Sequence, residues 1–343
     1  MSNPFAVRHD MHLPSLVGWC YATRNEVRLT SRGGRLPTLS VGWDSRTATI
    51  ENYGRAFGFL AHVPGCTVFG PGFVKTPAND IYVKEFTHRQ YAAHADLLEN
   101  WTEDEPTVIN NPAVYIGGWE NWGHWLFQYL TKLAALPDEL YGTPLIVPKG
   151  LPVTFYACLE KMHFYDYIKV DGPVTGDNLW TVTPGAYRGA DMRPCVWPEA
   201  IHFVRDRLVG RPDLRNRPRL YISRADARWR RVANEPALID VLQRRGFQTV
   251  QLERLSLHEQ LDLLGRAEMI VTPFGAGSTS VMLAPSDCRV LTFGPSQMSG
   301  EMGAKLYSDI LGQPFQRLRC QAPTTDSDYY VDIPAIIDLM EAA

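Results

Sequence analysis

The sequence predicts an α/β fold composed of two Rossmann-like domains with parallel sheets. Its 343 residues exceed what one hydrophobic core usually fills, so two domains are expected. Hydrophobic residues make up 45% of the chain, which provides enough apolar mass for two cores. From residue 113 onward, short apolar runs alternate with segments of helical periodicity, and this alternation is typical of a parallel sheet covered by helices.

Residues 1–110 show a different pattern. Short alternating runs at 47–59 and 66–83 are separated by glycine and proline. This composition predicts β-hairpins or a meander. We therefore expect a β-rich N-terminal extension in front of the first α/β domain.

The clearest helix of the first half is predicted over residues 122–136, where apolar residues recur at i, i+3 and i+4. Asn121 is expected to cap this helix, and Pro137 to end it. The break at 210–212 (Gly-Arg-Pro) predicts that the first domain covers residues 1–211. Its other predicted elements are strands at 113–117, 145–147 and 167–170, and helices at 153–162 and 197–208.

The second half is more regular, and its domain is predicted to cover residues 212–325. Ser256 and Glu259 form a capping-box sequence, and Asn234 is expected to cap the preceding helix. Residues 326–343 end in an amphipathic helix at 333–340, which we expect to pack back on the N-terminal domain. The other predicted elements are strands at 219–223, 247–252, 269–272 and 289–293, and helices at 235–245, 256–266 and 280–283.

Composition excludes several classes of protein. A net charge of −3 gives no electrostatic case for nucleic acid binding. The chain has no export signal at its start and no apolar run of membrane-spanning length, so a soluble, cytoplasmic protein without a transmembrane segment is expected. The cysteines lack metal-ligand spacing and are expected to be reduced thiols. They are Cys20, Cys66, Cys158, Cys195, Cys288 and Cys320.

A glycine-rich turn, FGAGSTS at 274–280, lies between a predicted strand and a predicted helix. Small residues at the carboxyl end of a strand let a phosphate approach the backbone, and the following helix start offers free N–H groups. Glycines also simply permit a tight turn, so the pattern alone leaves both interpretations open. The candidate phosphate-binding residues of this turn are Gly275, Ala276, Gly277, Ser278 and Thr279.

Ten arginines crowd into residues 205–231, and most of them are expected on the solvated surface. Arg224 stands out because it directly follows a predicted strand, at the same sheet edge as the glycine turn. Arg230 or Arg231 is a second candidate phosphate ligand, with Glu235 either steadying that arginine or meeting a ribose hydroxyl. Glu235 is also favourable at a helix start whatever else it does.

His124 lies in the first turn of the 122–136 helix, just past a strand end. A helix N-terminus favours the neutral imidazole, which can accept a proton as a general base. A histidine beside aromatic residues is more often structural. One further motif, Asp326-Ser327-Asp328, fits a metal-binding D-x-D pattern, but it lies in a polar stretch that indicates a solvated linker, and no metal is expected.

These motifs together resemble the glycosyltransferase 61 family. The resemblance rests on YISR at 221–224, NE at 234–235, GF at 246–247, EQ at 259–260 and GAG at 275–277, in the family's order and intervals. Two segments of the first half, NWGHWLFQYLTKLAALP at 121–137 and CTVFGPGFV at 66–74, are similar to the family as well. The family's glycine turn commonly begins with His, where this chain has Phe274, so the choice of donor is open.

The resemblance implies a GT-B-like arrangement, in which an acceptor-side domain and a nucleotide-sugar-binding domain face a cleft. It implies an inverting glycosyltransferase that takes its sugar from a nucleoside-diphosphate sugar without a metal or cofactor. Arg224 and the 275–277 turn would hold the diphosphate, Glu235 would lie beside the nucleotide, and His124 would lie near the acceptor. The acceptor would be a saccharide or a glycolipid, in bacterial surface polysaccharide or glycan synthesis, in the cytoplasm or peripheral at the inner membrane.

Three alternatives remain open at this stage. If His124 is not the base, Asp166, Glu120 and Asp191 are the next candidates. The chain could instead be an inactive nucleotide-sugar-binding protein, which the Phe274 substitution makes conceivable. A dinucleotide-dependent oxidoreductase is less favoured, because no strand is followed by G-x-G-x-x-G with an acidic residue about 20 positions later.

Overall fold

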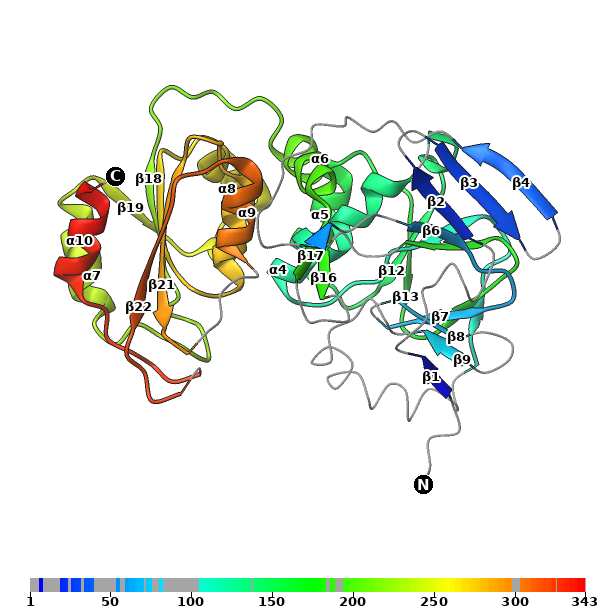
Figure 1. Ribbon diagram of the computed structural model, residues 1–343, viewed down its shortest axis with the longest axis horizontal. Helices are drawn as coiled ribbons and strands as arrows, with labels where there is room; N and C mark the ends of the chain where they lie inside the picture. The colour runs from blue at the N-terminus through cyan, green and yellow to red at the C-terminus, as the bar shows by residue number, and fades with distance from the viewer. Residues whose placement is uncertain are drawn as a thin grey trace. The chain divides into compact units, whose positions relative to one another are not determined.

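The computed structural model describes residues 59–75, 105–182, 194–297 and 303–342, apart from 71, 137 and 325, together with the backbone of shorter strands before residue 59 and at 80–82 and 186–188. The chain divides into two compact units, Met1–Val204 and Arg205–Ala343 (Figure 1). Both units are mixed α/β structures with parallel strands, as predicted. None of the helices in the described part of the chain combines the length and the apolar character needed to span a bilayer.

The larger sheet of unit 1 has the strand order β13-β12-β11-β15-β6-β2-β3-β4. Its first four strands are parallel, and the remaining pairs are antiparallel. The N-terminal hairpins therefore extend the parallel sheet. The strands are β2 (Trp19–Thr23), β3 (Glu26–Ser31), β4 (Gly34–Leu39), β6 (Phe59–His62), β11 (Ala113–Tyr115), β12 (Leu145–Pro148), β13 (Tyr167–Val170) and β15 (Leu179–Val182).

The described part of unit 1 also contains two smaller sheets, with orders β1-β9-β8-β7-β14-β10 and β16-β17-β5. Buried side chains of the first, such as Val68 and Val174, pack against Tyr115 and Ile146 of the large sheet to form one core. The strands are β1 (Ala6–Arg8), β5 (Gly54–Arg55), β7 (Thr67–Phe69), β8 (Phe73–Lys75), β9 (Asp80–Tyr82), β10 (Thr107–Val108), β14 (Val174–Thr175), β16 (Ala186–Arg188) and β17 (Pro194–Val196).

The predicted helix at 122–136 forms, but its winding changes along its length. It begins as α4 (Trp122–His124), continues as a π-helix, η1 (Trp125–Tyr129), and ends as a 3-10 helix, η2 (Leu130–Ala135). Side chains all around this segment are buried, including the polar Gln128 and Lys132. A π turn inside a helix is frequent at functional sites, because it re-aims the neighbouring side chains. The described part of unit 1 also contains η3 (Asp138–Leu140), α5 (Val153–Lys161) and the first part of α6 (Pro198–Val209).

Unit 2 is built on a fully parallel sheet with the strand order β19-β18-β20-β21-β22. Helices cover both faces of this sheet, and Figure 1 shows α7 and α10 on one side and α8 and α9 on the other. The strands are β18 (Arg219–Ile222), β19 (Phe247–Val250), β20 (Met269–Pro273), β21 (Arg289–Pro295) and β22 (Phe315–Cys320). The helices are α7 (Glu235–Gln243), η4 (Leu252–Arg254), α8 (Leu257–Gly265), η5 (Ala276–Leu283), α9 (Ala304–Leu311) and α10 (Ile333–Glu341).

The C-terminal helix α10 packs within unit 2, and the expectation that residues 326–343 pack on the N-terminal domain is wrong. Ile336 and Met340 of α10 join Leu238 of α7 and Val271 of β20 in one buried cluster. The apolar face of α10 is thus buried by the sheet of its own unit.

The boundary between the units falls inside α6, after Val204, and not at the predicted 210–212 break. The last turns of this helix are anchored in unit 2. Arg205 Nε donates to the carbonyl of Ala284 (3.1 Å), and a Cβ on Gly265 would lie 2.6 Å from a methyl carbon of Val209. These contacts override the local Gly-Arg-Pro signal at 210–212.

Three further differences concern the end of unit 2 and the glycine turn. Strand β22 and helix α9 were not predicted. Helix η5 starts at Ala276, four residues before the predicted helix at 280–283, so it follows the first glycine of the turn directly.

The Ser256–Glu259 capping box forms with both of its hydrogen bonds, as predicted.

Candidate functional site

The candidate site of unit 2 lies where two neighbouring parallel strands end. Arg224 follows β18, and Gly275 follows β20. These strands pair directly, with Tyr221 opposite Val271, so the residues after their carboxyl ends meet at one edge of the sheet. In open α/β sheets this edge is the usual ligand-binding edge.

Arg224 lies against the glycine turn. A Cβ on Gly275 would be 1.7 Å from Nη1 and 2.5 Å from Cζ of Arg224. The backbone of Gly275 is extended (φ 169°), a conformation open to any residue, so the close approach of the guanidinium is what requires glycine there. Gly277 differs, because a Cβ on it would meet only Ile222, at an ordinary contact distance of 3.6 Å.

The Glu235 side chain holds the backbone at the start of the Arg224 loop by a hydrogen bond. Its buried carboxylate accepts hydrogen bonds from the hydroxyl of Tyr221 (2.6 Å) and from the backbone N–H of Arg224 (3.3 Å). Burial and the Glu235 carboxylate together raise the pKa of Tyr221, so the phenol stays protonated and donates a hydrogen bond to Glu235. Glu235 thus positions the start of the Arg224 loop.

The Arg224 side chain is half-buried. Its Nη2 donates to the carbonyl of Trp229 (3.2 Å), whereas its Nε is buried and meets no acceptor among the residues described. Burial, and then the positive charge of Arg230, lower the pKa of Arg224. A guanidinium in this setting gains from an added anion, because an unmet buried N–H is costly.

Two further arginines surround Phe274, the residue before the glycine turn. The guanidinium carbons of Arg230 and Arg317 lie 5.8 and 5.9 Å from the centre of its ring. Arg230 has a left-handed backbone (φ 58°), which an arginine adopts only when the surrounding structure imposes it. Arg317 comes from β22 and was missed in the sequence because its strand was missed.

Arg231, by contrast, joins its loop to the 326–331 segment by an ion pair with Asp328. Its Nε and Nη2 donate to Oδ2 of Asp328 (3.0 and 2.8 Å), and its backbone N–H donates to Oδ1 (2.9 Å). The same two segments are joined by a parallel bridge between Val232 and Tyr329. Asp328 of the D-x-D motif is thereby used in an ion pair, and no group of side chains in the described part of the chain could hold a metal.

Asn234 occupies the predicted N-cap position of α7, but its side chain does not cap the helix. Its amide instead pairs with the backbone of Val331, donating to the carbonyl (2.8 Å) and accepting from the N–H (3.0 Å). Both bonds fix the 326–331 segment on the loop that carries Arg230. The prediction that Asn234 caps α7 is therefore wrong, because its side-chain amide binds the backbone of Val331 and not the N–H groups of the helix.

The hydroxyl of Ser278 serves the glycine turn itself, donating to the carbonyl of Gly275 (2.7 Å). Ser278 and Thr279 are both buried, whereas Ala276 and Gly277 are partly exposed at the start of η5. The exposed face of this turn is therefore backbone, and the first N–H groups of a helix have no partner one turn back.

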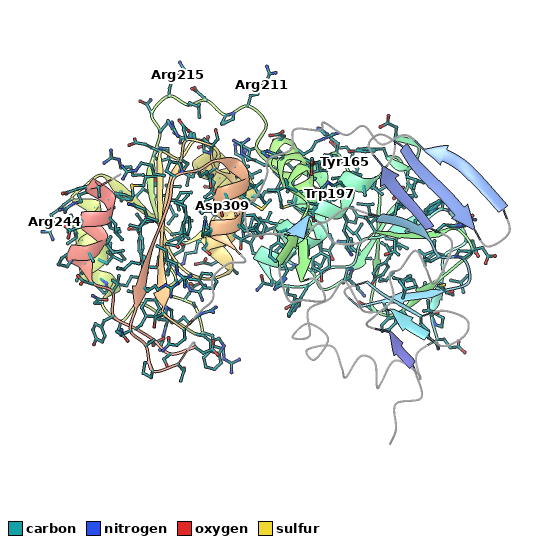
Figure 2. All side chains as sticks on the ribbon, viewed as in Figure 1. Tyr165, Trp197, Arg211, Arg215, Arg244 and Asp309 are labelled. Carbon is teal, nitrogen blue, oxygen red and sulfur yellow. The ribbon has the colours of Figure 1, made fainter. Side chains whose placement is uncertain are left out.

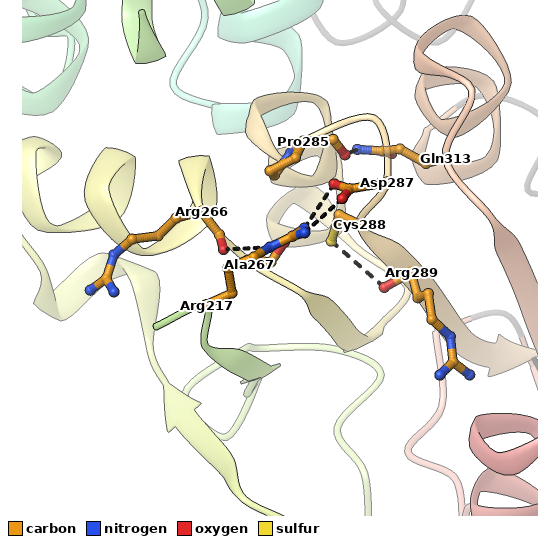
Figure 3. Close-up of polar contacts among 8 residues, drawn as sticks. All are labelled: Arg217, Arg266, Ala267, Pro285, Asp287, Cys288, Arg289 and Gln313. Atoms are coloured by element: carbon orange, nitrogen blue, oxygen red, sulfur yellow. Dashed lines mark hydrogen bonds and ion pairs between the residues drawn. The ribbon is translucent and has the colours of Figure 1, made fainter. Parts of the chain in front are cut away.

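Most other arginines of the 205–231 cluster have partners far from this edge. Figure 3 shows Arg217 at the opposite end of the strands, where it forms a bidentate ion pair with Asp287 (2.6 and 2.8 Å) and donates to the Arg266 and Ala267 carbonyls. Figure 2 shows Arg211 and Arg215 pointing away from the loop after α6, and Arg215 pairs with Asp213. Of the ten arginines, Arg224 and Arg230 are therefore the ones whose side chains lie beside the glycine turn.

His124 lies in unit 1, at the junction of α4 and the π-helix. The side chain of Asn121 caps the helix by accepting from the His124 N–H (3.2 Å), as predicted. The Nδ1 atom of His124 lies 2.6 Å from Oε1 of the buried Gln128, and the imidazole ring stacks on Trp119 with centroids 4.9 Å apart. The alternative bases are less constrained: Glu120 and Asp166 are exposed. Asp191 lies outside the described residues.

Comparison with known proteins decides the family. Residues 122–291 match the family model described as Glycosyltransferase 61. This chain belongs to the glycosyltransferase 61 family. It is therefore a glycosyltransferase, with a sugar donor and an acceptor as its substrates. The matched region includes His124, Arg224, Glu235 and Gly275, whereas Arg317 lies beyond it.

This family 61 glycosyltransferase is also distantly similar to a solved structure. One such structure is the bacterial iron-containing dodecameric glycosyltransferase TibC from enterotoxigenic E. coli H10407, at 10% identity and a TM-score of 0.36. It covers 80% of this chain and 82% of that chain, and it is too distant to bear on mechanism. No curated protein sequence matches this chain.

Proposed function

We propose that this glycosyltransferase transfers a sugar from a nucleoside-diphosphate sugar to a hydroxyl of a saccharide or glycolipid acceptor, with inversion and without a metal. One observation carries the proposal: the guanidinium of Arg224 packs on Gly275, beside the start of η5, at the carboxyl edge of a parallel sheet. This arrangement combines a fixed cation with free backbone N–H groups, and both bind phosphate oxygens.

The diphosphate would lie between the Arg224 guanidinium and the amides of Ala276 and Gly277. The exposed surface of this turn is backbone, which lets phosphate oxygens approach closely. Glu235 would act through Arg224, since its carboxylate is already engaged by Tyr221 and the Arg224 N–H. We therefore assign Glu235 a positioning role in place of the ribose contact considered from the sequence.

His124 would be the general base. An amide oxygen only accepts, so with Gln128 Oε1 as its partner the imidazole would carry its proton on Nδ1. In the neutral ring this leaves the lone pair on Nε2, which can accept the proton of an acceptor hydroxyl. The Trp119 ring stacked on His124 and the Asn121 cap hold the imidazole in place.

The reaction would be a single displacement. The acceptor oxygen bonds to the anomeric carbon, its proton passes to His124 Nε2, and the bond from that carbon to the phosphate oxygen breaks. The electron pair leaves with the nucleoside diphosphate, whose added charge is met by Arg224 and the helix amides. One positioned donor of this kind is worth about 10²–10³ in rate, and a general base about 10²–10⁴.

For the biological setting we propose bacterial surface polysaccharide or glycan synthesis in the cytoplasm, including attachment at the inner membrane surface. The family resemblance supports this setting. Four cysteines, Cys66, Cys158, Cys288 and Cys320, are buried free thiols, which is usual in a reducing compartment.

The decisive experiment is a donor screen. The purified chain is incubated with a panel of nucleoside-diphosphate sugars, and release of the nucleoside diphosphate is measured with and without saccharide acceptors. We expect release with one nucleotide class and its loss in Arg224→Ala. Binding of a donor without any release would indicate an inactive binding protein, and stabilisation by NAD alone would indicate a dinucleotide enzyme.

A further inference from the structure

Phe274 brings two arginines from distant parts of unit 2 to the glycine turn. Arg230 comes from the loop before α7, and Arg317 from β22, yet both guanidinium groups lie within 6 Å of the Phe274 ring centre, at 5.8 and 5.9 Å. Arg224 lies on the adjoining residue, Gly275. Three guanidinium groups thus surround one dipeptide.

The position of Phe274 is fixed by the neighbouring strand. Its backbone N–H donates to the carbonyl of Phe293 in β21 (2.7 Å). A Cβ on Gly294 would lie 3.0 Å from the Phe274 Cβ, so the glycine lets Phe274 lie flat on β21. Because β22 pairs with β21, with Arg317 opposite Thr292, the Arg317 side chain starts one strand away from Phe274.

The electrostatics of this cluster favour an anion with more than one charge. The charge of Arg230 lowers the pKa of Arg224, and burial followed by the charge of Arg319 lowers that of Arg317. Like charges held together with part of their hydration removed are stabilised by a bound polyanion. Cation–π contact with the Phe274 ring holds the Arg230 and Arg317 guanidinium groups beside the glycine turn.

We propose that Arg317 is a third diphosphate ligand, which binds the same donor diphosphate as Arg224 and Arg230, with Phe274 as the platform that holds Arg230 and Arg317. This inference rests on the proposed function, because it assumes that the Arg224 edge binds a nucleoside diphosphate. It adds a binding residue from outside the segment that matches the family.

Calorimetric titration with inorganic pyrophosphate and with nucleoside diphosphates tests the proposal. We expect Arg317→Ala to weaken binding of both probes by about tenfold or more, as loss of a charged hydrogen bond does. Arg317→Lys should recover only part of the affinity, because a point charge replaces the planar fork. Arg319→Ala is the matched control: it removes the same charge two residues further along the same strand, from an exposed side chain. We expect it to change affinity less than about threefold.

A second variant tests the same site without changing Arg317, in case the Arg317 variants lose binding because they misfold. Phe274→Leu leaves all three charges but removes the ring, and we expect it to weaken pyrophosphate binding by several-fold with an unchanged melting profile. If Arg317→Ala and Arg319→Ala have equal, small effects while Arg224→Ala abolishes binding, the Arg317 assignment is overturned and the proposed function stands. If the unmodified protein binds neither probe, both fail.

Discussion

Replacing Gly275 by alanine should remove diphosphate binding without unfolding the protein. The new Cβ would lie 1.7 Å from Arg224 Nη1, whereas an ordinary contact begins near 3.4 Å. The guanidinium must therefore retreat by about 1.7 Å along that line. A hydrogen bond of about 2.9 Å to a phosphate oxygen would lengthen to about 4.6 Å, beyond any hydrogen bond.

The loss can be given a magnitude. A hydrogen bond to a charged group contributes about 1.5–3 kcal/mol, which corresponds to about 10- to 150-fold in affinity. Stability should fall by no more than about 1 kcal/mol, the net value of the Arg224–Trp229 hydrogen bond, because the displaced atoms are the end of a flexible side chain. Gly275→Ala should therefore match Arg224→Ala in affinity and resemble the unmodified chain in melting.

The assay is calorimetric titration with the tightest-binding nucleoside diphosphate, and Gly277→Ala is the matched control. A Cβ on Gly277 meets Ile222 at only 3.6 Å, so this variant should bind normally. The double variant Arg224→Ala with Gly275→Ala should be no weaker than Arg224→Ala alone, since both act through one guanidinium. Normal binding by Gly275→Ala, or equal losses from the two glycine variants, would refute the reasoning.

Other predictions address the remaining parts of the account. His124→Ala should lower turnover at least about tenfold with nearly unchanged nucleoside diphosphate affinity; equal turnover would reassign the base. Arg231→Ala should lower the melting temperature while diphosphate binding persists, since Asp328 holds its guanidinium; loss of binding at unchanged melting would contradict this. Burial raises the pKa of the Cys158 and Cys288 thiols to about 12, so native protein at pH 8 should resist alkylation at both positions, as mass spectrometry of the peptides would show. The same shifts mean that unfolding releases these protons above pH 9, so the free energy of unfolding should decrease between pH 9 and 12.

Much of unit 2 could be predicted because its signals are local. Apolar strands, the Ser256–Glu259 capping box and the helix stops are encoded within a few residues, and all appear in the structure. The meeting of Arg224 with Gly275 also followed from a local signal, since both residues come directly after parallel strands. The direct contact between them, and the requirement for glycine, needed coordinates.

The failures share another cause, contacts between residues far apart in the sequence. Asn234 is a good cap sequence, but Val331 competes for its amide. Strand β22 has the sequence FQRLRC, and its two arginines interrupt the apolar pattern that predicts a strand. It is stabilised by pairing with β21, which the sequence does not show. Because β22 was not predicted, Arg317 was not recognised as a candidate. The C-terminal helix shows an apolar face, but the sequence does not say which sheet buries it.

The central claim is that one anion site is formed by Arg224 and the start of η5. A crystal structure of the protein with its preferred nucleoside diphosphate tests this most directly. The account predicts phosphate oxygens within hydrogen-bonding distance of the Arg224 guanidinium and of the Ala276 or Gly277 amide. A diphosphate bound elsewhere, with Arg224 still against Gly275 and out of reach, would contradict it.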